Sequence, residues 1–304
     1  MGFYKKGVFI MNKKLKESSF KVNIEDSILD DLLGRVKNSR ILKDFGNKEW
    51  KYGTEETYLR NLIDYWSNQY DWKKQEKEIN KFSHYKIKID DIPIHFIYEK
   101  GSGENSKPLI LTHGWPWTFW DYKKIIEPLT RPENYGGDIS ESFDVIIPSL
   151  PGYGFSTPLK ETGINFWKTS DIWVELMTNI LGYEKFFAHG GDWGAAVTLQ
   201  LGHKYSEIVP AIHTHMAVPI DFVTNPHPDI SFYSESEKKW HEKNMNFVTE
   251  GNGYFQIQAS RPQTLAYGLN DSPVGLLAWL IEKRRAWSDC NGDIESRFSK
   301  DDLI

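Results

Sequence analysis

Residues 186–196 read Phe186-Phe187-Ala188-His189-Gly190-Gly191-Asp192-Trp193-Gly194-Ala195-Ala196. An apolar, aromatic run ends in two glycines, an acidic residue follows at once, and small residues then open a helical segment. The pattern predicts a strand, a sharp turn and a helix, with Asp192 at the turn.

The spacing around Asp192 matches a nucleophile elbow, Gly-x-Nuc-x-Gly, which exposes its central residue above a parallel sheet and beside the first NH groups of a helix. Aspartate stands where a serine hydrolase has serine. Serine attacking a saturated carbon would leave an ether, whereas a carboxylate leaves an ester that water can cleave. Asp192 is therefore predicted to attack an epoxide or an alkyl halide. The alternative is that it only caps the helix that follows.

The residues around this turn alternate between strand-like and helix-like segments. Short, continuous apolar runs predict strands that are buried on both faces. These strands are expected at 109–112, 145–148, 186–189 and 211–216, with helices at 118–129, 166–181 and 194–206. The order predicts an α/β fold with a mostly parallel sheet and helices on both faces. An antiparallel hairpin is expected before it, at 85–90 and 94–98, with its turn at 90–93.

Two further loops follow predicted strands and belong to the same edge of the sheet, where ligands bind in such folds. The first is His113-Gly114-Trp115-Pro116-Trp117 and the second is Pro151-Gly152-Tyr153-Gly154-Phe155-Ser156. The backbone NH groups of Trp115 and Trp193 are predicted to form an oxyanion hole. His113 is expected to orient its loop by hydrogen bonding and not to transfer a proton.

Together these motifs resemble the α/β-hydrolase-fold epoxide hydrolases, in particular the microsomal and juvenile-hormone type, which has an N-terminal helical meander. The resemblance runs from about residue 20 to the last residue. It implies that Asp192 attacks an epoxide carbon, that lid tyrosines hydrogen-bond the epoxide oxygen, and that a histidine paired with an acid activates water to hydrolyse the ester.

Tyr254 matches the first of the two lid tyrosines, and a phenol suits the role because it can donate to an oxygen that gains charge as the ring opens. Without the resemblance, a half-buried rim tyrosine with no catalytic part is the alternative. The predicted catalytic residues are thus Asp192 and Tyr254. The residues predicted to shape the site are His113, Gly114, Pro116, Gly191 and Phe155.

No metal or cofactor is expected. Asp289, Asn291, Asp293 and Glu295 imitate a calcium loop, but Ile294 and Lys300 occupy its glycine and glutamate positions. His213 and His215 share one face of a predicted strand, but no third ligand appears at a suitable spacing, so zinc is not expected.

The expected organisation is a tail (1–19), a helical meander (20–83), an α/β-hydrolase core (84–219) and the start of a lid (220–304). No strand-like run follows residue 216, so we expect a core truncated at its C-terminus that lacks the water-activating histidine and its acid. Such a chain would form the ester without completing turnover. The competing interpretations are a haloalkane dehalogenase-like hydrolase and a truncated, non-catalytic remnant.

Composition narrows the partners. The 304-residue chain has a net charge of −5 and no basic block, which argues against nucleic acid. No segment has the ~20 apolar residues of a membrane helix, so no membrane anchor is expected. The single cysteine, Cys290, fits a reducing compartment, and we expect a cytoplasmic protein. Aromatic residues near the site favour a small apolar or aromatic epoxide, with water as the second substrate.

Overall fold

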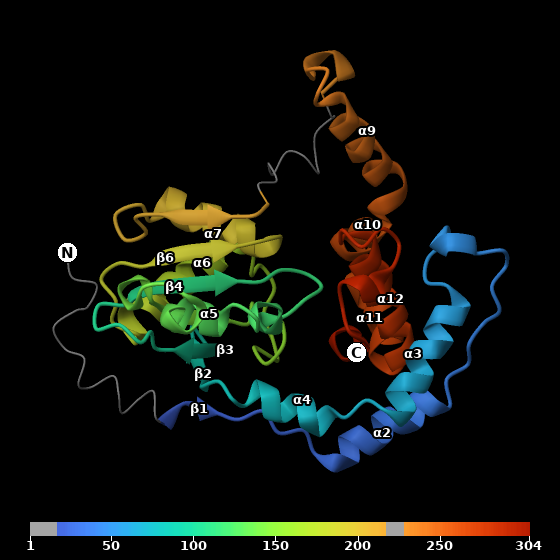
Figure 1. Cartoon of the computed structure of the whole chain (residues 1–304), viewed down its shortest axis with the longest axis horizontal. Helices are drawn as coiled ribbons and strands as arrows, with labels where there is room; N and C mark the ends of the chain where they lie inside the picture. Colours follow the sequence, from blue (N-terminus) through green and yellow to red (C-terminus); the bar gives the residue numbers. More distant parts are fainter. Residues whose placement is uncertain (1–16, 217–227) are drawn as a thin grey trace. The chain divides into compact units, whose positions relative to one another are not determined.

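The computed structural model describes residues 17–216 and 228–304, which form two compact units (Figure 1). Of the described residues, the sheet unit comprises 17–23 and 73–216, and the helical unit comprises 24–72 and 228–304. Most of the predicted tail, 1–19, and the predicted start of the lid at 220 lie outside the described residues.

Within residues 17–216, the sheet unit is built on seven strands in the order β1-β2-β3-β5-β4-β6-β7. Strands β4 to β7 pair in parallel, and β1 to β3 add an antiparallel edge. The bounds are β1 Ser19–Phe20, β2 His84–Ile89, β3 Ile92–Glu99, β4 Lys107–Thr112, β5 Phe143–Pro148, β6 Phe187–Gly190 and β7 Ile212–Thr214. The predicted α/β fold is confirmed, although β7 is shorter than the run at 211–216 suggested.

The β2–β3 hairpin turns on two residues, Asp90 and Asp91, whose φ angles are 51° and 63°. Positive φ at both positions is typical of the tight turns that match the twist of paired strands. The predicted turn at 90–93 was therefore too long, because Pro93 already pairs with Lys88 inside the hairpin. Proline is tolerated there, since β3 pairs with β5 only from Phe96 onward and no ladder bond is lost on that side.

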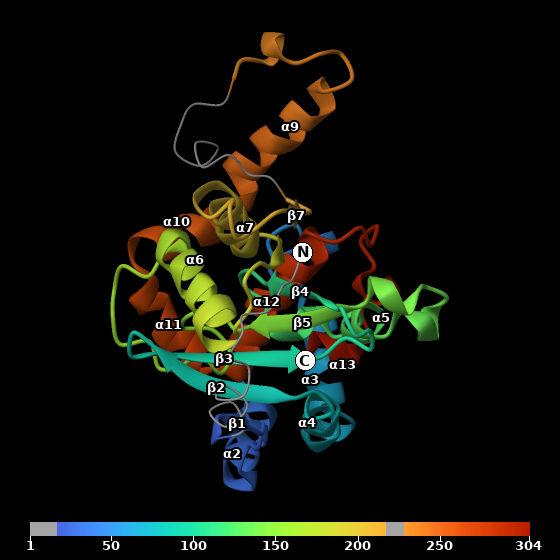
Figure 2. The same cartoon turned by 90° about the vertical axis from the view of Figure 1, so that its left-hand side faces the viewer.

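Helices lie on both faces of the sheet (Figure 2). The longer helices of this unit are α4 Trp72–Ile79, α6 Phe166–Val174, which continues as a π-helix η5 over Glu175–Ile180, and α7 Trp193–Lys204. The short ones are η2 Phe119–Tyr122, α5 Ile126–Thr130, η3 Pro132–Tyr135 and η4 Ile139–Glu141.

The predicted helix at 118–129 was wrong as a continuous element, because the structure has η2 and α5 in its place. Pro128 explains the break. It lacks an NH and its ring would clash with the preceding turn, so it is tolerated only in the first turn of a helix. The chain therefore starts a new helix at Ile126, just before the proline.

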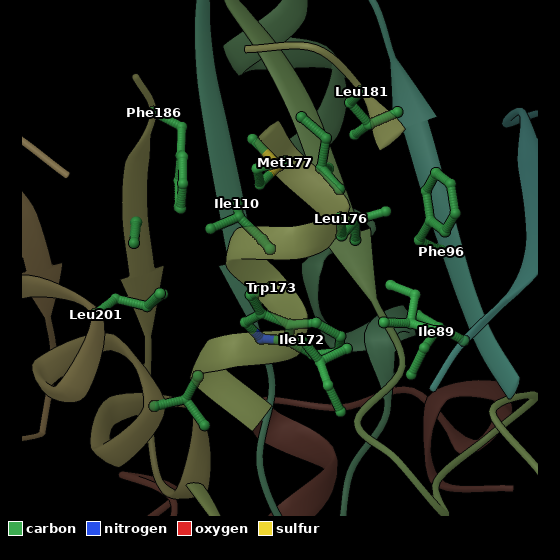
Figure 3. Packing of buried hydrophobic residues seen from close by; sticks show 14 of the residues in the cluster. Ile89, Phe96, Ile110, Ile172, Trp173, Leu176, Met177, Leu181, Phe186 and Leu201 are labelled. Carbon is green, nitrogen blue, oxygen red and sulfur yellow. The ribbon is translucent and has the colours of Figure 1, made fainter. Parts of the chain in front are cut away.

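Alternation along the strands divides the apolar side chains between the two faces. Ile110 and Ala188 point toward α6 and α7, where Trp173 is completely buried (Figure 3). Leu109, Leu111 and Phe187 point to the opposite face, where they line an apolar hollow of about 490 Å³ beside α5. The packed layer under α6 and α7 holds the carboxyl ends of β4 and β6 in place.

The helical unit joins segments from both ends of the described chain. Val36, Leu59 and Leu62 pack in one hydrophobic cluster with residues that follow residue 270. Those partners are Val274, Leu277, Ile281, Ile294 and Leu303. The helices are α2 Asp26–Lys37, η1 Lys48–Trp50, α3 Glu56–Asn68, η6 Ile230–Phe232, α9 Lys238–Asn246, η7 Phe247–Gly251, α10 Gly253–Ser260, α11 Pro262–Asp271, α12 Pro273–Ala286, η8 Ile294–Ser296 and α13 Lys300–Leu303. The domain boundaries at 83 and 219 stay predictions.

Candidate active site

Asp192 lies between β6 and α7 with φ 53° and ψ −127°, a conformation that non-glycine residues rarely adopt. The turn needs glycine at positions 190 and 194, because the backbone passes very close to other backbone atoms there. A Cβ on Gly190 would collide with the carbonyl of Gly194, and a Cβ on Gly194 would collide with the carbonyl of Thr112. The sequence thus folds locally into a strained turn that holds one carboxylate at the sheet edge.

Two backbone NH groups donate to the same oxygen of this carboxylate. Trp193 NH lies 2.7 Å and Trp115 NH 2.8 Å from Oδ1 of Asp192. Among residues 17–216 and 228–304, Oδ2 of Asp192 accepts no hydrogen bond. One oxygen is therefore held in place by two donors, whereas the other is not.

The carboxyl group of Asp192 is largely buried. Burial raises the pKa of its carboxyl, whereas the NH groups of Trp193 and Trp115 and then the nearby His215 act in the opposite direction. A carboxylate that has lost part of its hydration is a stronger base and nucleophile than one in water.

His113 fastens the loop that carries Trp115. Leu150 NH donates to its Nε2, 3.1 Å away, so Nδ1 carries the proton and donates to the carbonyl of Gly114 at 3.1 Å. Burial lowers the pKa of His113 to about 4, so the ring is neutral at pH 7. This geometry supports the predicted orienting role.

The remainder of this loop fits closely against Asp192. Gly114 packs directly on Asp192, because a Cβ there would collide with Cβ and Oδ1 of the aspartate. Trp115, Pro116 and Trp117 are all half-buried. A larger residue at 114 would thus disturb the carboxylate and its NH donors together.

Phe155, predicted to shape the site, lies in an aromatic cluster with its ring 5.2 Å from His95, 5.3 Å from Phe20 and 5.8 Å from Phe119. Tyr153, in the same loop, is close enough to Asp192 to interact with its charge: burial and then the charge of Asp192 raise the pKa of the Tyr153 phenol. Phe155 and Tyr153 are only two positions apart in the sequence. The fold of the loop directs Phe155 into the aromatic cluster and places Tyr153 near Asp192.

His215, which the sequence did not predict to belong to the site, lies against the elbow. A Cβ on Gly191 would collide with Cε1 and Nε2 of its imidazole. A third histidine, His189, lies beside His213, although the sequence spacing did not indicate it. The rings of His189 and His213 stack with centroids 4.9 Å apart. No group of three or more side chains suited to a metal ion occurs in the parts of the chain that the structure describes.

Tyr254 belongs to the helical unit, in the first turn of α10. Its ring lies 5.1 Å from the ring of Trp287, and the Lys283 ammonium lies 5.2 Å from its centroid. Its action on an epoxide oxygen stays a prediction.

Two families match this chain. The family described as "Epoxide hydrolase N terminus" matches residues 17–122, and the family described as "alpha/beta hydrolase fold" matches residues 107–265. A putative epoxide hydrolase of Stigmatella aurantiaca is 38% identical, over 94% of this chain and 64% of the relative. Epoxide hydrolase 1 of Sus scrofa is 34% identical, over 94% of this chain and 67% of the relative. The crystal structure of juvenile hormone epoxide hydrolase from Bombyx mori superposes with a TM-score of 0.82 at 26% identity, covering 100% of this chain and 75% of that one.

The sheet, the elbow and these matches define an α/β hydrolase. Within that class, the chain belongs to the epoxide hydrolase family, as the motifs predicted, and the dehalogenase-like alternative is not favoured. The chain spans about two thirds of the length of the curated relatives it matches. None of the helices in residues 17–216 and 228–304 has the length and apolar composition of a membrane span.

Proposed function

We propose that Oδ2 of Asp192 attacks a ring carbon of an epoxide and forms an alkyl ester. The observation that carries this proposal is the pair of NH bonds on Oδ1, at 2.7 and 2.8 Å. They aim Oδ2 away from the backbone, and Oδ1 becomes the carbonyl oxygen of the ester. The names of the matched relatives support the epoxide as the substrate class.

The electrons and protons balance within the chain and its substrate. The new C–O bond forms as the ring C–O bond breaks, and the departing oxygen takes the proton of the Tyr254 phenol. Water then attacks the carbonyl carbon of the ester, and charge develops on Oδ1, where the NH groups of Trp193 and Trp115 stabilise it. Cleavage of the ester releases a diol, and the proton that water loses returns to the Tyr254 phenolate, so that Asp192 is again a carboxylate and Tyr254 again a phenol. We assign ester formation to the residues named here and treat ester hydrolysis as a separate step.

The residues next to Asp192 support an apolar or aromatic substrate. Trp193 is 44% exposed beside the carboxylate, and Trp115 and Trp117 are half-buried in the facing loop. Flat indole surfaces favour an apolar group on the epoxide. We also propose a reducing compartment such as the cytoplasm, because the single cysteine, Cys290, is a buried, free thiol.

The test is incubation of the chain with styrene oxide, followed by intact-protein mass spectrometry and diol analysis. The matched control is Asp192→Asn, which keeps an oxygen for the two NH donors but cannot form the ester in the same way. We expect an adduct of one epoxide mass on Asp192, or a diol, from the chain and neither from the variant. If the chain yields neither product, or the variant yields as much, the proposal fails. Halide release from a brominated alkane would favour the dehalogenase instead.

A further inference from the structure

A lysine on α12 lies among three aromatic rings, one of which is the ring of Tyr254. Trp279, Lys283 and Trp287 are four residues apart, so they lie on one side of the helix and its continuation. The Lys283 ammonium lies 5.2 Å from the ring of Tyr254, 5.6 Å from that of Trp279 and 6.0 Å from that of Trp287. A cation is thus enclosed by three aromatic rings, one of which belongs to the predicted acid.

Lys283 is unusual because only 9% of its surface is exposed. Lysine is rarely buried to this extent unless its charge is paired, because removing an ammonium from water is costly. Lys283 forms an ion pair with Glu282, its immediate neighbour, although adjacent residues point to different sides of a helix. The rings supply the remaining stabilisation, since the faces of tryptophan and tyrosine attract cations.

The position of Lys283 is set by the packing of α12. Val274, Leu277 and Ile281 recur at helical spacing and pack into the cluster shared with α2 and α3. The Ser272 side chain caps the helix by accepting from Gly275 NH at 2.9 Å. The helix is therefore fixed along one face by its core and at its first turn by a cap, which holds Lys283 in place against Tyr254.

We infer that Lys283 is a positioning residue that orients Tyr254 and makes its phenol a better proton donor in epoxide opening. The inference rests on the proposed function. As the O–H bond of Tyr254 breaks and the proton passes to the epoxide oxygen, negative charge spreads from the phenol oxygen into the ring. An ammonium against the ring face stabilises that charge, and Lys283 itself gains and loses no proton.

The experiment measures Asp192-dependent consumption of styrene oxide as a function of pH. Lys283→Met keeps the unbranched stem and removes the charge, Lys283→Arg keeps the charge, and Lys243→Met is the matched control. Lys243 is exposed, and its ammonium lies 4.9 Å from the ring of Trp240, so its substitution removes a comparable contact away from Tyr254.

We expect Lys283→Met to react about tenfold more slowly at neutral pH, which is the effect of one cation–π contact of ordinary strength. The loss of rate at high pH, where the phenol ionises, should move to higher pH in this variant. Lys283→Arg should restore most of the rate and the original pH profile, and Lys243→Met should behave as the unchanged chain. A purely structural role would slow the reaction without moving the profile, and that result would overturn the inference.

Tyr254→Phe separates this inference from the function on which it rests. If Tyr254→Phe consumes epoxide as fast as the unchanged chain, the proposed role of Tyr254 is wrong. If Tyr254→Phe is slow while Lys283→Met keeps its rate and profile, only the inference about Lys283 is wrong. In the Tyr254→Phe background, adding Lys283→Met should cost little more, because the phenol proton that Lys283 is inferred to influence is already absent.

Discussion

The side chain of Asp192 accepts a hydrogen bond from the first turn of α7, as a helix cap does, but it also has features that a cap does not require. A capping residue normally has extended backbone angles and serves the first turn of its own helix. Asp192 has a φ of 53°, and its Oδ1 also accepts from Trp115, 77 positions earlier in the chain. A donor brought from a distant loop to the same oxygen supports a site that stabilises charge, and so favours the nucleophile over the simple cap.

At the same scale, Gly114 offers a sharp test. Gly114→Ala should abolish ester formation on Asp192, because the added methyl would collide with the carboxylate and force the Trp115 loop away. The measurement is the yield of the epoxide adduct or diol. Gly34→Ala is the control, since a Cβ at Gly34 in α2 meets nothing within 4 Å. That change should leave the reaction intact and stabilise the chain by roughly 0.5–1 kcal/mol. An active Gly114→Ala variant would contradict the close packing described here.

At the scale of elements, the β2–β3 hairpin is tied to its neighbours by a buried chain of histidines. His84 Nε2 donates to the Ile79 carbonyl at 2.9 Å, and its Nδ1 accepts from Nε2 of His95 at 2.9 Å. His95 Nδ1 then accepts from the Ser149 hydroxyl at 2.9 Å. When both rings are neutral, every ring nitrogen takes part in a hydrogen bond. A proton added to Nδ1 of His84 would place that N–H opposite the N–H of His95, so that two donors would face each other.

These hydrogen-bonded histidines make the stability of the fold depend on pH. Burial lowers the pKa of His95 from its ordinary 6.5 to about 2 and also lowers that of His84. Below pH 6.5 the unfolded chain therefore binds protons that the folded hairpin excludes, so stability is complete above 6.5 and is lost as pH falls. We expect His95 alone to lower the unfolding free energy by about 1.4 kcal/mol per pH unit below 6.5.

Denaturant titrations at a series of pH values, followed by tryptophan fluorescence, measure this slope. His95→Asn should reduce it, whereas His203→Asn, at an exposed position on α7, should leave it unchanged. A slope near zero for the unchanged chain between pH 4 and 6.5 would show that the two histidines do not resist protonation.

At the scale of the whole molecule, the N-terminal helices pack against α12, the helix whose Lys283 lies against the ring of Tyr254. Leu62 of α3 is 0% exposed and packs in the cluster that also holds α12. Leu62→Ala should cost about 2–5 kcal/mol through lost burial and the cavity it leaves. Hydrogen exchange should then become faster in α2, α3 and α12 together. Leu42→Ala, at a side chain that is 88% exposed, should change none of them. Unaltered exchange in α12 would argue against the shared core.

The local pattern of residues was enough to predict the class of fold and the turn that bears Asp192. Period-two alternation, continuous apolar runs and a Gly-x-Asp-x-Gly spacing depend only on neighbours in the chain, which is why the hairpin, β4 to β6 and α7 were predicted correctly. The same reasoning failed where one residue overrides a pattern: Pro128 split a predicted helix, and two aspartates with positive φ shortened a turn.

Only the tertiary structure decided that both NH groups bind the same oxygen of Asp192. It also decided that Tyr153, and not Phe155, interacts with the charge of Asp192, and that Lys283 lies against Tyr254. Each of these depends on side chains far apart in the sequence meeting at chosen distances. Those distances follow from how helices and loops pack around two separate cores, and no spacing along the chain encodes them directly.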